Sequence, residues 1–174
     1  MSDDQHDCCK VNFPTTKGKC PACGAMGKGV SSFTVSLFLK DPTLYLREKS
    51  LPPGRYYICE TRSCPTVYFT DSGVQFNKTD IRVKVWQKED DPMVPACYCF
   101  GNSVATIQNE IIQTGNTDVI SRIGAEVRAG NCRCEVTNPQ GSCCLGNVAK
   151  AVKIAKENLT HQLSIVRSKR QTSV

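Results

Sequence analysis

The chain has 174 residues, of which 40% are hydrophobic and 22% charged, and 22 Lys and Arg against 16 Asp and Glu leave a net charge of +6. This composition excludes a wholly disordered chain, and the length suits one compact domain or two small ones. No apolar run approaches the roughly 18 residues of a membrane-spanning helix, and the acidic start Met1–Asp7 is unlike a secretory signal, so we expect a cytoplasmic protein.

The high cysteine content, 12 residues, points to metal binding, because a reducing cytosol keeps thiols from forming disulfides. Two of these cysteines lie in the first segment, residues 1–17, which we expect to be flexible. Cys8 and Cys9 stand beside His6, and thiolate is a suitable soft ligand for Cu⁺. The alternative is a mobile terminus with idle cysteines.

Residues 18–88 favour strands. Ser32–Leu39 and Ile81–Trp86 alternate apolar and polar side chains, and Arg55–Cys59 and Thr66–Thr70 are β-branched and aromatic. A turn signal at residues 71–73 predicts a hairpin that joins 66–70 to 74–76. A core of so few strands is small, and domains of this size often need a structural metal.

Two close thiol pairs frame this β-rich module, Cys20-Pro-Ala-Cys23 and Cys59-Glu-Thr-Arg-Ser-Cys64. Each pair sits on a tight turn that directs two sulfurs to one point, and two such turns close a tetrahedron around Zn²⁺ at Zn–S distances of about 2.3 Å. The pattern predicts a four-cysteine zinc site, with buried reduced cysteines as the alternative. A closed shell of four thiolates leaves no position for water, so the predicted role is structural.

Residues 89–96 are polar and charged and contain two prolines, which predicts a linker. Beyond it, residues 97–165 have the period of amphipathic helices. A first helix is capped by Ser103 and ended by Gly115, a second runs from Thr117 to Gly130, and a third begins near Asn147. The apolar stripe of the third helix comprises Val148, Val152, Ala155, Leu159 and Leu163. Residues 166–174 are predicted to be a basic tail, the frayed end of that helix.

Six further cysteines precede the starts of two of these helices: Cys97 and Cys99, then Cys132, Cys134, Cys143 and Cys144. Four thiolates from two such loops suit an iron–sulfur cluster, whose negative charge is favoured by helix N-termini. The predicted fold class is therefore α+β, with a small zinc-bound β-rich N-terminal module followed by a small α-helical domain that holds an iron–sulfur cluster, of the [2Fe–2S] type that the resemblance below implies.

These motifs resemble known families. Cys-x-Cys, two short helices and a cysteine-bearing loop that opens a helix resemble the [2Fe–2S] domain of bacterioferritin-associated ferredoxins. The strings Cys-Tyr-Cys-Phe (97–100) and Cys-Glu-Val-Thr-Asn-Pro-Gln-Gly-Ser-Cys-Cys-Leu-Gly-Asn (134–147), after the four-cysteine module, resemble the N-terminal region of CopZ-type copper chaperones, which carry both zinc and [2Fe–2S].

The resemblance implies a set of ligands and a role. It implies a redox or metal-carrier protein of copper homeostasis rather than an enzyme. Such a protein reduces Cu(II) to Cu(I) and binds copper ions, a copper-carrying protein and a redox partner. The family's chaperones continue into a copper-binding domain with a Met-x-Cys-x-x-Cys loop; the sequence to Val174 has none, so we expect a separate carrier. The implied ligands are Cys20, Cys23, Cys59 and Cys64 for zinc and Cys97, Cys99, Cys134 and Cys144 for the cluster, and spacing leaves Cys132 and Cys143 open as substitutes.

Other functions fit less well. The sequence has only two histidines, His6 and His161, and no glycine-rich phosphate loop, which disfavours an enzyme. An iron-linked ferredoxin-like or cluster-sensing protein stays an alternative, as does a zinc-ribbon nucleic-acid-binding module. Against nucleic acid, zinc and cluster thiolates would each change the formal charge by about −2. The basic residues of the β-rich half also form no run: Arg47, Lys49, Arg55, Arg62, Lys78, Arg82 and Lys84.

Overall fold

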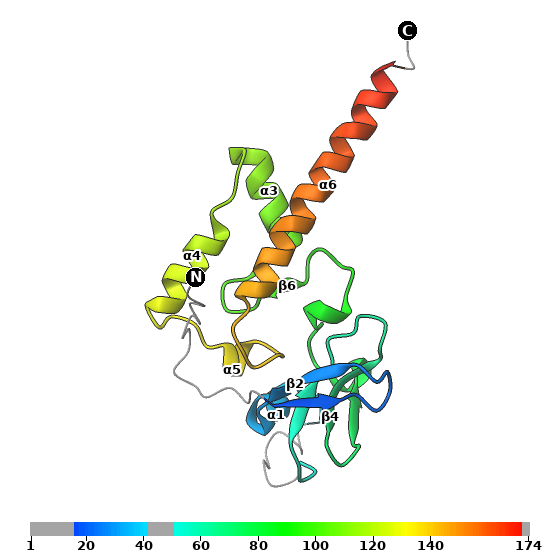
Figure 1. Cartoon of the computed structure of the whole chain (residues 1–174). Coiled ribbons are helices and arrows are strands. Elements are labelled where there is room, and N and C mark those ends of the chain that lie inside the picture. The colour runs from blue at the N-terminus through cyan, green and yellow to red at the C-terminus, as the bar shows by residue number, and fades with distance from the viewer. Residues whose placement is uncertain (1–15, 42–50, 172–174) are drawn as a thin grey trace, which may run out of the picture.

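The strand-forming residues of the N-terminal half form an antiparallel sheet in the computed structural model, which describes residues 16–41 and 51–171 (Figure 1). Within those ranges the sheet has five strands in the order β1-β2-β3-β4-β5. The predicted strands at 55–59 and 66–70 and the hairpin after them are confirmed. The strands are β1 (Lys17–Lys19), β2 (Met26–Val30), β3 (Tyr56–Ile58), β4 (Thr66–Thr70) and β5 (Gln75–Asn77).

Strand alternation gives this sheet two different faces. On one face, the cross-strand partners Tyr57 and Phe69 stack with ring centroids 5.3 Å apart and pack among the cysteines of the first set. On the other face, Tyr68 and its partner Ile58 pack in an apolar core. Gly27 in β2 makes room for the first face, because a Cβ there would lie 2.8 Å from the Phe69 ring.

The predicted strand at residues 32–39 is wrong: this segment is the helix α1 (Ser32–Phe38). Ser31 starts it, since the Ser31 Oγ accepts a hydrogen bond from the Thr34 N–H at 3.2 Å. Val35 and Phe38 are buried on one side, whereas Phe33 is 44% exposed. A strand would have placed Phe33 on the same face as Val35, so the burial follows the helical period and not alternation.

The predicted strand at residues 81–86 is also wrong. Ile81 forms only an isolated bridge with Leu39, and the chain then turns into a 3₁₀ helix, η3 (Trp86–Lys88). Ile81 and Val85 pack in the core of the sheet module, while Trp86 belongs to the second core. The segment therefore bends between Ile81 and Trp86, and its side chains contribute to both cores. A second 3₁₀ turn, η2 (Lys78–Asp80), precedes it.

The C-terminal half is helical, as predicted, with a two-stranded ribbon at its start. Ser103 caps the first helix through a hydrogen bond from the Thr106 N–H, and Gly115 ends it in the left-handed conformation, with a φ of 81°. At the second helix the N-cap is Asp118 and not the predicted Thr117, whose Oγ1 accepts a hydrogen bond from the Val119 N–H. The elements are β6 (Pro95–Cys97), β7 (Asn102–Ser103), α3 (Val104–Thr114), α4 (Val119–Arg128), α5 (Cys134–Thr137) and α6 (Leu145–Gln171).

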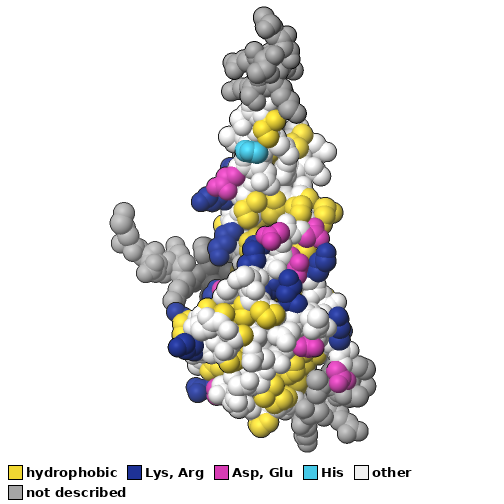
Figure 2. All heavy atoms as spheres, turned by 90° about the vertical axis from the view of Figure 1, so that its right-hand side faces the viewer, with side chains coloured by type: hydrophobic (Ala, Val, Ile, Leu, Met, Phe, Trp, Pro, Cys, Tyr) yellow, Lys and Arg dark blue, Asp and Glu magenta, His cyan; other side chains and the backbone are white. Residues whose placement is uncertain are grey.

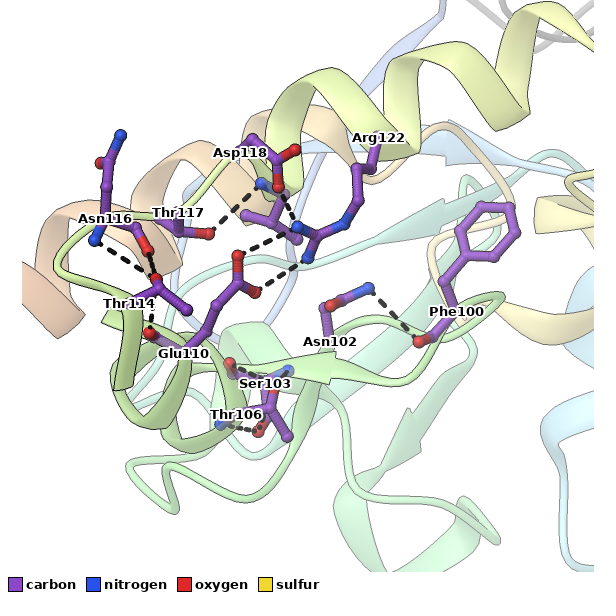
Figure 3. Close-up of polar contacts among 11 residues, drawn as sticks. Phe100, Asn102, Ser103, Thr106, Glu110, Thr114, Asn116, Thr117, Asp118 and Arg122 are labelled. Atoms are coloured by element: carbon purple, nitrogen blue, oxygen red, sulfur yellow. Dashed lines mark hydrogen bonds and ion pairs between the residues drawn. The ribbon is translucent and has the colours of Figure 1, made fainter. Parts of the chain in front are cut away.

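An ion-pair network fixes α3 against α4 (Figure 3). The guanidinium of Arg122 in α4 contacts both carboxylate oxygens of Glu110 in α3, at 3.0 and 2.8 Å, and also Asp118 at the start of its own helix. This network lies on the surface, since the Arg122 side chain is 50% exposed. Apolar packing therefore contributes most of the stability here.

The second core forms where α6 packs against α3 and α4. Val148 and Ala155 of the predicted stripe are buried and contact the cluster that contains Ile107, but Leu163 is 61% exposed. The last turns of α6 extend past the body of the protein (Figure 1), and the helix runs to Gln171 through the predicted tail. The predicted linker also contributes to this core, through Val94 and Ala96. Within residues 16–41 and 51–171, no helix is both long and apolar enough for a bilayer.

Candidate metal centres

The cysteines of the first set converge at one end of the sheet. Their four sulfurs all lie within 4.8 Å of one another, with Sγ–Sγ distances of 4.0 Å for Cys20–Cys64 and 3.7 Å for Cys23–Cys59. A tetrahedral site with metal–sulfur bonds of about 2.3 Å has sulfur–sulfur edges of about 3.8 Å. The donor set and its spacing therefore fit Zn²⁺.

Two tight turns direct these sulfurs. After β1, the N–H of Gly24 donates to the Cys20 carbonyl at 2.8 Å, and Gly24 has a φ of 74°, which favours glycine. Between β3 and β4, the N–H of Cys64 donates to the Thr61 carbonyl at 3.1 Å. Lys88, whose side chain is buried, donates from Nζ to the carbonyls of Thr61 (2.7 Å) and Cys64 (3.2 Å). The second turn is thus held from η3, by a residue that no sequence pattern marked.

The thiols of the first set differ in environment. Burial raises the pKa of Cys20 to about 12 and also raises the pKa of Cys64. Cys23 is exposed, and a hydrogen bond from the Ala25 backbone lowers its pKa to about 6. Cys23 is therefore the thiol of this set that loses its proton most readily.

A second group of thiols gathers between β6, α5 and α6. The Sγ atoms of Cys99 and Cys134 are 3.7 Å apart, and the Cys144 thiol lies near enough to those of Cys97 and Cys134 to shift their pKa values. Cys97, Cys134 and Cys144 are buried, and Cys99 is partly exposed. Two of the four cysteines that the resemblance implied, Cys99 and Cys134, are thus in direct contact, and the assignment of all four as ligands stays a prediction. Cys132 and Cys143 are partly exposed and each makes a polar interaction of its own.

The four thiols of the second group differ in pKa. Hydrogen bonds from Cys134 and Cys97 lower the pKa of Cys144 to about 4, and a hydrogen bond from Cys134 lowers that of Cys99 to about 6. The same contacts with Cys144 raise the pKa values of Cys97 and Cys134. Cys144 and Cys99 are therefore the thiols of this group that lose a proton most readily.

Further polar groups surround the Cys99 sulfur. Thr137 Oγ1 lies 2.9 Å from it, and the backbone N–H of Arg133 donates to it at 3.4 Å. Hydrogen bonds to cluster sulfurs are one of the means by which a protein sets a cluster's potential. Sequence reasoning missed Thr137 and Arg133. The signal that could have indicated them is their position within three residues of Cys134.

The loop that carries Cys144 is held by buried amides. Gln140 Nε2 donates to the carbonyls of Ser142 (3.1 Å) and Cys143 (2.8 Å), and Asn138 Nδ2 donates to the Ser142 carbonyl at 3.0 Å. Asn147 Nδ2 donates to Gln140 Oε1 at 2.8 Å. These contacts fix the approach to the N-terminus of α6, where the Val148 N–H bonds the Cys144 carbonyl.

The basic residues of the sheet module are distributed and mostly paired. On the face in Figure 2, basic and acidic side chains are interspersed. Lys28 pairs with Glu60, and Arg82 lies over the Phe38 ring. Exposed pairs such as these contribute little to stability and leave no concentrated positive field. The other pairs are Arg55–Asp71, Arg62–Asp90, Lys78–Glu89 and Lys84–Asp91. The predictions for His6, Cys8, Cys9, Arg47 and Lys49 concern positions outside the described residues.

Comparisons with known proteins agree with a four-cysteine zinc site in the sheet module. Residues 17–82 match the CopZ-type family described as a zinc binding domain. The copper chaperone CopZ of Archaeoglobus fulgidus is 32% identical over 126 residues, which are 72% of this chain and 57% of that protein, so the match spans little more than half of the relative. The X-ray structure of the Archaeoglobus fulgidus CopZ N-terminal domain is similar with a TM-score of 0.59 and 28% identity, over 76% of this chain and 96% of that one.

These similarities bear on fold, cofactor and role. The sheet module has the architecture of the CopZ N-terminal domain, and zinc binding is supported by both the family match and the four-cysteine group. The relative is named a copper chaperone, and this chain matches 57% of its length. The chain therefore carries a CopZ-type zinc binding domain and is related to the N-terminal region of the copper chaperone CopZ.

Proposed function

We propose that this protein is an electron-transfer protein of copper homeostasis that holds zinc and a [2Fe–2S] cluster and reduces Cu(II) to Cu(I) for a copper carrier. The zinc ligands are Cys20, Cys23, Cys59 and Cys64, and the cluster ligands are Cys97, Cys99, Cys134 and Cys144. Zinc acts as a structural ion, because four thiolates close its shell. This assignment makes the protein a redox and metal carrier rather than an enzyme.

The observation that carries the proposal is the second group of thiols. Its four sulfurs come from two segments that are far apart in the sequence, and the 3.7 Å separation of Cys99 and Cys134 Sγ is the spacing of ligands around a shared metal group. Cys144 stands at the N-terminus of the 27-residue helix α6, whose dipole favours negative charge. Both features suit a cluster with four thiolate ligands.

The proposed reaction is a one-electron exchange. When bound by Cys97, Cys99, Cys134 and Cys144, a [2Fe–2S] cluster would supply one-electron redox chemistry, by which an electron from a reducing partner protein would reduce Cu(II) to Cu(I). The chain's own residues hold the group and set its exposure. Cys99 is the partly exposed member of the set, so we expect the electron to leave on that side.

The test begins with the metals. We expect the anaerobically purified protein to contain about two irons, two sulfides and one zinc per chain, with visible charge-transfer bands. Two zinc ions with neither iron nor sulfide, from cells given ample iron, would contradict the cluster assignment.

The copper step needs its own control, because free thiols also reduce Cu(II). Cu(II) is added without oxygen to the reduced protein, and Cu(I) is counted with a chromogenic Cu(I) chelator while the cluster spectrum is followed. We expect one Cu(I) per cluster oxidised, above the amount formed by the Cys134→Ser variant, which lacks the cluster. An unchanged spectrum of the reduced protein after Cu(II) addition would refute the copper role.

A further inference from the structure

The loop that carries Cys144 rests on the zinc-binding module. Tyr68, in the middle of β4, is fully buried and donates from its hydroxyl to the Pro139 carbonyl at 2.5 Å. Thr34 of α1 donates from Oγ1 to the Glu135 carbonyl at 2.9 Å. Gly141 packs on the same helix, since a Cβ there would lie 3.0 Å from Thr34 Oγ1. Figure 1 shows α5 and this loop directly above the sheet and α1.

A further contact reaches the loop from η3. Gln87 Nε2 donates to Gln140 Oε1 at 2.6 Å, and both side chains are buried. Gln140 in turn holds the carbonyls of Ser142 and Cys143. Because the Gln140 side chain bonds both Gln87 and these carbonyls, a displacement of Gln87 would move the two residues before Cys144.

The same supports connect to the first set of cysteines. Tyr68 is the register partner of Ile58, the residue before Cys59. Lys88, next to Gln87, bonds the carbonyls of Thr61 and Cys64. Tyr68 therefore pairs with the strand that leads into Cys59, and Gln87 is the neighbour of the residue that bonds the turn of Cys64.

We propose that Tyr68 and Gln87 are positioning residues for the loop Asn138–Cys144, and that zinc in the first set thereby slows the loss of the group held by the second set. The identity of that group rests on the function proposed above, whereas the positioning of the loop does not. Allosteric coupling of two binding sites through a shared contact usually changes an equilibrium by about 5- to 150-fold.

The test compares two tyrosines. Tyr68→Phe removes the hydroxyl that bonds the Pro139 carbonyl, and Tyr56→Phe removes one that bonds the Pro52 carbonyl, also at 2.5 Å, within the zinc module. Each variant loses one oxygen and one hydrogen bond to a prolyl carbonyl. Only Tyr68→Phe loses a contact with the loop that carries Cys144. If both variants lose the same thermal stability but only Tyr68→Phe alters the loop, the cause is positioning of the loop and not general stability.

Two readouts are measured on the full chain. The first is amide hydrogen exchange of residues 138–144 in the zinc-loaded, iron-free protein. We expect exchange to be about five- to tenfold faster in Tyr68→Phe than in wild type, unchanged in Tyr56→Phe, and at least as fast in zinc-free wild type. Gln87→Ala should reproduce Tyr68→Phe with a full zinc content, which covers the case in which one variant does not fold.

The second readout is the rate at which the loaded protein releases iron to a chelator, which should rise by a similar factor in Tyr68→Phe and Gln87→Ala only. Equal exchange of residues 138–144 in both tyrosine variants, or no response of these amides to zinc removal, would overturn the proposal. Because the exchange readout needs no cluster, it decides the matter even if the wild-type chain binds no iron and the proposed function fails.

Discussion

Gln87 and Lys88 are adjacent in the chain, yet their buried side chains bond the loops of two different cysteine sets. Gln87 donates to Gln140 at 2.6 Å, and Lys88 donates to the carbonyls of Thr61 and Cys64 at 2.7 and 3.2 Å. The 3₁₀ turn Trp86–Lys88 makes this possible, because it directs consecutive side chains to different sides. The two candidate metal centres therefore share one short support.

Lys88→Met is predicted to weaken the first site without touching its thiols. The change keeps the apolar stem but removes the buried hydrogen bond to the Cys64 carbonyl and one of the two donors to the Thr61 carbonyl, which should lower the free energy of unfolding by about 1–3 kcal/mol. Urea unfolding and the rate of zinc transfer to a chelator measure this. Lys150→Met, at an exposed position of α6, is the matched control and should leave both values within error of wild type.

Serine substitutions are predicted to distinguish the ligands within each close pair of cysteines. Cys134 and Cys144 are buried and bond the other thiols of the second group, so Cys134→Ser and Cys144→Ser should lose most of the iron and sulfide. Cys132→Ser and Cys143→Ser should keep them. Iron, sulfide and zinc are measured on the same samples, with zinc expected at one per chain throughout. Iron loss in Cys143→Ser but not in Cys144→Ser would reverse the assignment.

Ile107→Ala is predicted to test the second core. Ile107 is 1% exposed and packs where α3 meets α6, so truncation should cost about 2–5 kcal/mol through lost burial and a cavity. Ile112 lies on the same helix but is 61% exposed, and Ile112→Ala should change stability by less than about 0.5 kcal/mol. Chemical denaturation followed by far-UV circular dichroism gives both values. Similar losses in the two variants would contradict the packing of α3.

Asp71→Asn is predicted to destabilise the sheet module in a pH-dependent way. The Arg55 side chain and backbone N–H each donate to this carboxylate at 3.0 Å and lower its pKa. A lowered folded pKa stabilises the fold above the unfolded value of about 3.9, and this stabilisation disappears as the pH falls through the folded pKa.

The variant should therefore be less stable than wild type at pH 7 and equal to it near pH 2, as measured by thermal unfolding at the two pH values. Asp90→Asn is the control, since its side chain is 92% exposed, and it should show little change at either pH. A difference between wild type and Asp71→Asn that persists unchanged at low pH would show that charge is not the cause.

Much of the fold could be predicted because its signals are local. The aromatic and β-branched runs at β3 and β4 form strands, and Ser103 and Gly115 begin and end α3. The cysteine spacing also determined which thiols form the first group, because each close pair needs only a tight turn to direct two sulfurs to one point.

The tertiary structure decided the rest. The residues 32–38 have a pattern that fits either period, and burial of Val35 and Phe38 under the sheet selected the helix α1. The residues 81–86 alternate, but among the described residues only Ile81 forms a bridge, to Leu39, and the segment bends into η3 instead of forming a strand. The supporting roles of Tyr68, Gln87 and Lys88 depend on partners as far as 71 residues away in the chain, and no local pattern encodes a contact between side chains that only packing brings together.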